Sequence, residues 1–104
     1  MSSILDDRQT VKEYWFAITL IYAGHDLVSV TPCDRHTEFV ILCPRFDFEE
    51  FSREYAEGKL QIADAKAFGK TASQIGRLIR DAKRDGVYVN PDFEEMLRDE
   101  QERR

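Results

Sequence analysis

Five of the six basic side chains between residues 65 and 84 are the part of the sequence best suited to recognise another molecule. Asp64 before this stretch and Gly86 after it mark the two ends of a predicted helix at about residues 65–84. At 100° per residue, these five basic side chains fall in one sector of the helix and apolar side chains fall in the opposite sector. The basic face consists of Lys66, Lys70, Arg77, Arg80 and Arg84, and the apolar sector of Phe68, Ala72, Ile75, Ile79 and Ala82.

The basic face has two interpretations. Its like charges favour contact with nucleic-acid phosphates or with an acidic protein. The alternative is a solvated helix side that the acidic C-terminal residues partly neutralise. We find no helix-turn-helix pattern, zinc finger or stacking-aromatic motif on this face, so a nucleic-acid partner would be held by its backbone rather than read by its bases.

Two cysteines and two histidines are the candidates for metal binding or nucleophilic catalysis. Cys33 and His36 fall in one predicted turn, whereas His25 and Cys43 fall about 20 Å away at the other end of the same predicted hairpin. A closed zinc site takes four ligands, and each end offers only two. The Cys33–His36 pair also lacks a third group that would orient the histidine for catalysis. We therefore expect no metal site and no catalytic residue among these four side chains.

Residues 68–71, Phe-Gly-Lys-Thr, resemble the end of a phosphate-binding loop. That loop requires a glycine five residues before Gly69, where this sequence has Asp64. We therefore expect no nucleotide and no other cofactor. The prediction is that the chain is not an enzyme, and an enzyme whose site the sequence does not reveal is a third alternative.

Chain length and charge limit the number of domains and the kinds of partner that the protein can have. A chain of 104 residues predicts a single domain spanning residues 1–104. The net charge of −5 divides into −6 over residues 1–58, +4 over residues 59–86 and −3 over residues 87–104. An acidic total argues against nucleic-acid binding over the whole surface but leaves a local basic face open. Two unpaired cysteines, no signal peptide and no membrane span predict a cytoplasmic protein.

Two β-rich runs around a polar connection at residues 32–37 predict an antiparallel hairpin over residues 27–43. A turn centred on Arg35 would pair Val30 with Val40. A shift of one residue would pair Val30 with Phe39, and both registers stay open.

The remaining periodic segments predict helices. Thr10 and Glu13 match a capping box for a helix at residues 11–23 that ends at Gly24. Asp47 would cap a second helix at residues 48–57, with Phe46 and Phe51 as a hydrophobic staple. Residues 59–63 are a candidate edge strand, and residues 87–89 are a candidate short strand. Residues 1–9 are expected to be a loose arm, and residues 90–104 contain an acidic C-terminal helix at about residues 92–102.

These segments define the predicted fold. It is an α+β domain in which helices pack on a two-stranded antiparallel hairpin, with a short edge strand as a possible extension, in the order α-β-β-α-α-α. The segment Tyr14–Ala23 is apolar on all sides except at Thr19. Because such a helix requires burial on all sides, we expect it to form the interface of a homodimer.

Apolar positions and glycines between residues 10 and 80 carry a resemblance to a protein family. They include the run from Phe16 to Gly24, Phe39-Val40 in the hairpin, the run from Tyr55 to Ile62, and Phe68. In these positions the chain resembles an uncharacterised family of short α+β proteins in phage and bacterial genomes. The resemblance implies the same order of helix, hairpin and two helices, and implies no activity or site.

The function expected from the sequence is that of a small non-enzymatic binding module that uses the basic face. The alternative is a phage-type inhibitor or adaptor that occupies a basic site of a host protein. It would use acidic surfaces, either those of the last helix or Glu49, Glu50, Glu54 and Glu57.

Overall fold

Four strands and four helices follow one another along the chain. The structure is a computed structural model and describes residues 7–102, apart from the side chains of Met96 and residues 100–102. The elements are β1 (Arg8–Val11), α1 (Tyr14–Tyr22), β2 (Asp26–Pro32), β3 (Thr37–Leu42), α2 (Arg45–Ala56), α3 (Ala65–Asp85), β4 (Tyr88–Val89) and α4 (Pro91–Glu102).

The strands form one antiparallel sheet in the order β1-β3-β2-β4. This confirms the α+β class, but the predicted two-stranded hairpin is only the centre of the sheet. The observed element order is β-α-β-β-α-α-β-α, so the predicted order α-β-β-α-α-α lacks the first and the last strand. The candidate strand at residues 87–89 is confirmed as β4, whereas residues 59–63 contain no strand.

Strand β1 corrects two predictions about the N-terminus. Arg8 and Gln9 pair with Leu42 and Ile41, so this part of the expected loose arm belongs to the sheet. Residues 1–6 of that arm lie outside the described residues. Thr10 lies in the strand and does not cap a helix, because pairing with β3 places Val11 in the core at 4% exposure. Helix α1 therefore begins three residues later than predicted, at Tyr14.

Strands β2 and β3 pair in different registers at the two ends of the hairpin. Near the turn, Val30 pairs with Phe39, which is the shifted register. This register continues to Ser29 and Val40, whereas towards the open end Leu27 pairs with Ile41, so a β-bulge lies between Leu27 and Ser29. A bulge inserts one residue without a partner, and neither register predicted from the sequence extends through the whole hairpin.

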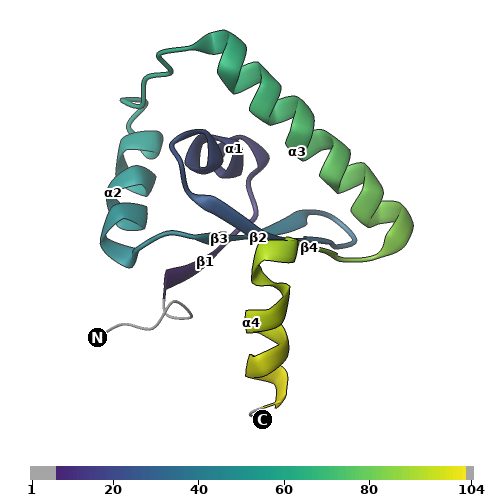
Figure 1. Cartoon of the computed structure of the whole chain (residues 1–104). Helices are drawn as coiled ribbons and strands as arrows, with labels where there is room; N and C mark the ends of the chain where they lie inside the picture. The colour runs from purple at the N-terminus through teal and green to yellow at the C-terminus, as the bar shows by residue number, and fades with distance from the viewer. Residues whose placement is uncertain (1–6, 103–104) are drawn as a thin grey trace.

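Three helices cover one side of the sheet. Figure 1 shows α1 between α2 and α3 on that side, while α4 leaves the sheet on the opposite side and points away from the other helices. The core is formed by Val30, Phe39 and Ile41 from the sheet, Ile18 and Leu20 from α1, and Ile75 from α3.

Helix α1 is buried by its own chain. Residues 16–20 are all buried, and Phe16 contacts the rings of Phe48 and Tyr55 in α2 at centroid distances of 5.7 Å and 5.0 Å. Trp15 stays 54% exposed and stacks on Phe68 of α3. The homodimer was expected because one chain was thought too small to cover this helix, and that reason no longer holds. The oligomeric state itself stays a prediction.

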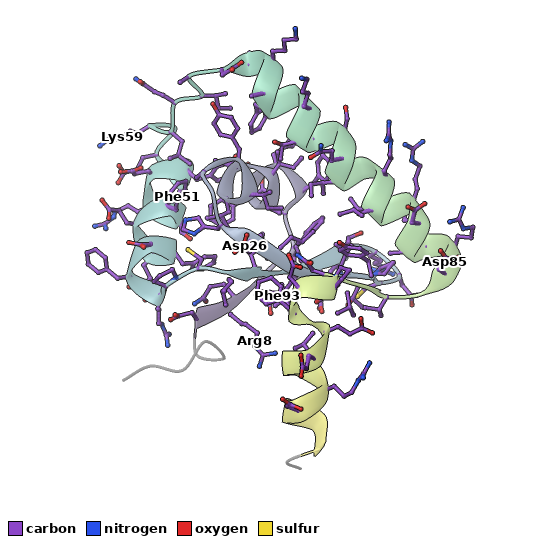
Figure 2. All side chains as sticks on the ribbon, viewed as in Figure 1. Arg8, Asp26, Phe51, Lys59, Asp85 and Phe93 are labelled. Atoms are coloured by element: carbon purple, nitrogen blue, oxygen red, sulfur yellow. The ribbon has the colours of Figure 1, made fainter. Side chains whose placement is uncertain are left out.

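Helix α2 starts earlier than predicted. It begins at Arg45, directly after Pro44, and Asp47 lies inside its first turn instead of capping it. The predicted staple is wrong because Phe46 is 75% exposed. Phe51 instead lies on the inner side of α2 and its ring is nearly perpendicular to the His25 ring, at a centroid distance of 5.9 Å (Figure 2).

Candidate interaction surface on helix α3

Local signals in the sequence define α3 well. The Asp64 carboxylate accepts a hydrogen bond from the Ala67 N–H at 3.0 Å, as expected of an N-cap residue. Gly86 ends the helix with a φ of 106°, a conformation that favours glycine. All members of the apolar sector pack in or against the core, with Ile75 and Ala82 buried. Because one side of α3 faces the core, the opposite basic side must face solvent.

The structure brings all five predicted residues of the basic face to the surface. Each of them is exposed. Lys66, Lys70, Arg77 and Arg80 form no ion pair with any part of the chain that the structure describes. At 1.5 Å per residue, these four side chains are distributed over roughly 21 Å of helix.

Arg84 differs from the other four residues. Its guanidinium lies 3.4 Å from the Asp81 carboxylate and 3.1 Å from the Asp85 carboxylate, at the end of α3 labelled in Figure 2. The Asp85 hydrogen bond and charge raise the pKa of Arg84, and the same contact lowers the pKa of Asp85. Its charge is thus neutralised within the helix. Asp81 lies three residues before Arg84, a spacing that sequence analysis could have recognised.

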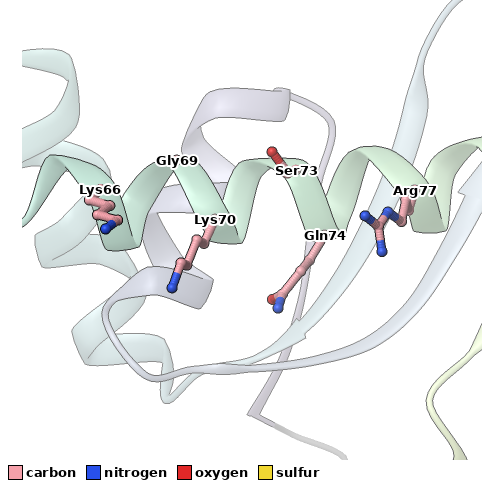
Figure 3. Close-up of a pocket in the computed structure, with 6 residues that line it drawn as sticks. All are labelled: Lys66, Gly69, Lys70, Ser73, Gln74 and Arg77. Atoms are coloured by element: carbon pink, nitrogen blue, oxygen red, sulfur yellow. The ribbon is translucent and has the colours of Figure 1, made fainter.

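Two adjoining surface hollows follow the basic face. The first is lined by Lys66, Gly69, Lys70, Ser73, Gln74 and Arg77, which Figure 3 shows in succession along α3. The second reaches the start of α1 and is lined by Tyr14, Ala72, Ser73, Gly76, Arg77 and Arg80. The hollows share Ser73 and Arg77, so they form one continuous surface. Sequence analysis missed Tyr14, whose hydroxyl donates to the Ala72 carbonyl at 2.9 Å.

Gly69 and Gly76 line these hollows without a packing reason to be glycine. A Cβ atom added at Gly69 would meet nothing within 4 Å. One added at Gly76 would lie 3.7 Å from the Tyr14 hydroxyl, an ordinary contact distance, so close packing within the chain does not explain Gly76 either. Each glycine costs the helix about 1 kcal/mol relative to alanine. What both positions have in common is open access to the backbone of α3.

The two ends of the hairpin hold the cysteines and histidines as predicted. At the open end, Cys43 Sγ lies 3.7 Å from His25 Nε2. Burial, followed by the charges of Asp47 and Asp7, raises the pKa of the Cys43 thiol to about 11. The thiol is therefore protonated at neutral pH and is a poor nucleophile.

At the turn, the structure adds a residue that sequence analysis missed. Glu38 Oε1 lies 3.4 Å from His36 Nε2, and the ligand atoms of Cys33, His36 and Glu38 all lie within 4.8 Å of one another. The signal in the sequence was the spacing: residues two apart in a strand point to the same side of a sheet. This end of the hairpin therefore offers three ligand atoms and not two.

The remaining candidate motifs have structural roles. Residues 68–71 lie inside α3 and not at a strand-to-helix turn, and the Thr71 hydroxyl donates to the Ala67 carbonyl at 3.2 Å. Glu49 pairs with Arg45 on α2, and Glu57 pairs with Lys59 directly after it, so two carboxylates of the acidic alternative already have basic partners.

Comparisons with protein-family models, curated proteins and solved structures found no match to this chain. The resemblance to a family of short phage and bacterial proteins therefore stays a prediction. Across residues 7–102, none of the helices combines the length and the apolar composition that crossing a bilayer requires.

Proposed function

We propose that the protein is a small non-enzymatic binding module whose basic face on α3 contacts an acidic surface of another protein. The observation that carries this proposal is the exposure of Lys66, Lys70, Arg77 and Arg80 and their lack of ion pairs within the described residues. They are exposed, and none of them pairs with a carboxylate in the described part of the chain. Four like charges held on one rigid helix side repel one another, and an anionic partner would relieve that repulsion.

The two glycines support close contact with the partner. They keep the hollows between the basic side chains open, although alanine would fit at both positions and would favour the helix. A partner that lies against the backbone of α3 would account for this composition. Ser73 and Gln74, between the two pairs of cations, would supply polar contacts.

An acidic protein is favoured over a nucleic acid. The net charge is −5, so the molecule as a whole repels a polyanion at long range. Four cations would also neutralise few phosphates of a nucleic acid, so counterion release would contribute little to such binding. A short acidic protein segment needs contact only with the basic face.

The inhibitor or adaptor alternative rests on acidic surfaces. Glu50 and Glu54 of α2 lie in a shared surface hollow with Arg53 and Lys59, so this side carries both signs of charge. Helix α4 projects from the rest of the molecule and its exposed side is acidic, which keeps this helix as the second candidate surface (Figure 1).

Charge reversal tests the proposal. The double variant Arg77→Glu, Arg80→Glu should keep its fold, because both side chains are exposed, and should bind its partner at least roughly ten-fold more weakly, since two exposed ion pairs are lost and two repulsions gained. Affinity capture from the source cell, with wild type and variants compared side by side, measures the loss. Binding that is unchanged in this variant would contradict the proposal.

The matched control is Lys12→Glu, Lys83→Glu. Both lysines are exposed and lie outside the basic face, and the control changes the net charge by the same amount. It should retain the captured acidic protein. A short mixed-sequence DNA duplex is tested in parallel by gel shift, and a shift that only the basic-face variant abolishes would identify a nucleic acid instead.

A second pair of substitutions separates binding from stability. Gly69→Ala and Gly76→Ala should each raise the free energy of unfolding by up to about 1 kcal/mol. If the partner lies in the hollows, the same substitutions should weaken capture. A more stable protein that binds equally well would show that the hollows do not contact the partner.

A further inference from the structure

The tip of the β2–β3 hairpin places a thiol, an imidazole and a carboxylate on one side of the sheet. Thr31 pairs with Glu38, and the Cys33 N–H donates to the His36 carbonyl at 2.8 Å, so Cys33 lies opposite His36 across the turn. Because side chains alternate along a strand, Glu38 points away from the core, opposite to the buried Phe39. The hairpin itself therefore holds the three groups together.

The spacing of these groups fits a tetrahedral metal ion. Nitrogen and oxygen ligands bind zinc at about 2.0–2.1 Å, so two of them at a tetrahedral angle lie about 3.3 Å apart. His36 Nε2 and Glu38 Oε1 are 3.4 Å apart. The Cys33 thiol lies within 4.8 Å of both atoms, and a sulfur ligand would need to lie about 3.6 Å from them. A rotation of the exposed Cys33 side chain, away from the Thr31 carbonyl that its thiol contacts at 3.7 Å, would bring Sγ closer to both atoms.

The chemistry of the three ligands selects the type of ion. A thiolate and an imidazole together favour Zn²⁺ and similar transition-metal ions over Mg²⁺ or Ca²⁺, which prefer oxygen ligands. Three protein ligands leave one tetrahedral position open to water or to a ligand from another molecule. Cys33 and His36 are exposed, so an ion can reach the turn directly from solvent.

We propose that the hairpin tip is a Zn²⁺-binding site formed by Cys33 Sγ, His36 Nε2 and a carboxylate oxygen of Glu38. Binding transfers the thiol proton of Cys33 to the buffer and replaces the His36–Glu38 contact by two bonds to the ion. This site is separate from the basic face and does not depend on the function proposed for α3. The sequence predicted only two ligands at this end of the hairpin, and Glu38 adds the third.

The experiment uses the untagged full chain, reduced and freed of metal. Titration with Zn²⁺ in a calorimeter should give saturable binding of one ion per chain with release of a proton. Titration with Co²⁺ should give the absorption band of a thiolate–cobalt bond. Because loss of an outer-shell partner already weakens metal binding roughly 10–100-fold, Cys33→Ser, His36→Ala and Glu38→Gln should each weaken it at least as much.

Cys43→Ala is the matched control, since it removes the other thiol at the opposite end of the hairpin. It should bind Zn²⁺ as tightly as the wild type and keep the thiolate–cobalt band. Absence of saturable binding, or a band that persists in Cys33→Ser, would overturn the proposal. Equal affinity of the wild type and Glu38→Gln would overturn the role of the carboxylate.

Discussion

The two cysteines illustrate how one residue type acquires different properties at two positions. Cys33 is exposed at the tip of the hairpin, beside two further ligand atoms. Cys43 is buried in the core at the open end of the hairpin, near the carboxylates of Asp7 and Asp47. Burial and these negative charges both disfavour the thiolate of Cys43. We therefore expect reactive and metal-binding chemistry only at Cys33.

The raised pKa of Cys43 has a consequence for stability at alkaline pH. Its thiol loses its proton near pH 9.0 in the unfolded chain and near pH 11 in the folded protein. Between these values the folded state holds one more proton, so the free energy of unfolding falls as pH rises, by at most about 1.4 kcal/mol per pH unit.

Denaturant unfolding at several pH values from neutral to strongly alkaline measures this effect. In Cys43→Ala the part of the slope due to Cys43 should be absent. Identical pH dependence in the wild type and Cys43→Ala would show that Cys43 is not shielded in the folded state.

At the scale of elements, the bulge in β2 depends on the segment that follows β4. The Asn90 side chain donates to the Leu27 carbonyl and its backbone N–H donates to the Val28 carbonyl, both at 2.8 Å. The Asn90 side-chain oxygen also accepts from the Asp92 N–H at 3.0 Å, at the start of α4. Asn90 thus donates hydrogen bonds to the carbonyls of Leu27 and Val28 at the bulge and accepts one at the start of α4.

Replacement of Asn90 tests this connection. Asn90→Ala should lower the free energy of unfolding by about 1–3 kcal/mol, because a partly buried carbonyl loses its partner. Asn90→Asp keeps an acceptor for the Asp92 N–H but removes the donor to Leu27, so it should also be destabilising. Chemical denaturation gives both values. If Asn90→Asp is as stable as the wild type, the donor to the bulge contributes nothing.

The sequence predicted some helices and strands more accurately than others. Helix α3 was predicted within one residue at its C-terminal end because Asp64, Gly86 and the apolar sector are local signals along one segment. Strand β1 was missed because its four residues carry little periodicity and become a strand only through pairing with β3. The position of β1 at the edge of the sheet, next to β3, could not be read from either segment alone.

At the scale of the whole molecule, the burial of α1 changes the expectation about assembly. A homodimer through the inner side of α1 would have to separate this helix from α2, α3 and the sheet of its own chain (Figure 1). We therefore expect light scattering at micromolar concentration to give the 12.2 kDa mass of one chain. A mass of about twice that value would place a dimer interface elsewhere, with the exposed Trp15 as the first position to test.

The sequence by itself determined the two ends and the polarity of α3 and the place of the hairpin, because capping, helical period and turn composition depend on residues close together in the chain. Tertiary structure decided which strands extend the hairpin and where β2 forms its bulge. It also decided that Cys33 lies opposite the His36–Glu38 pair, and that α1 is covered within one chain. These features depend on contacts between segments far apart in sequence or on the geometry of strand pairing, and such contacts leave no periodic signal in either segment.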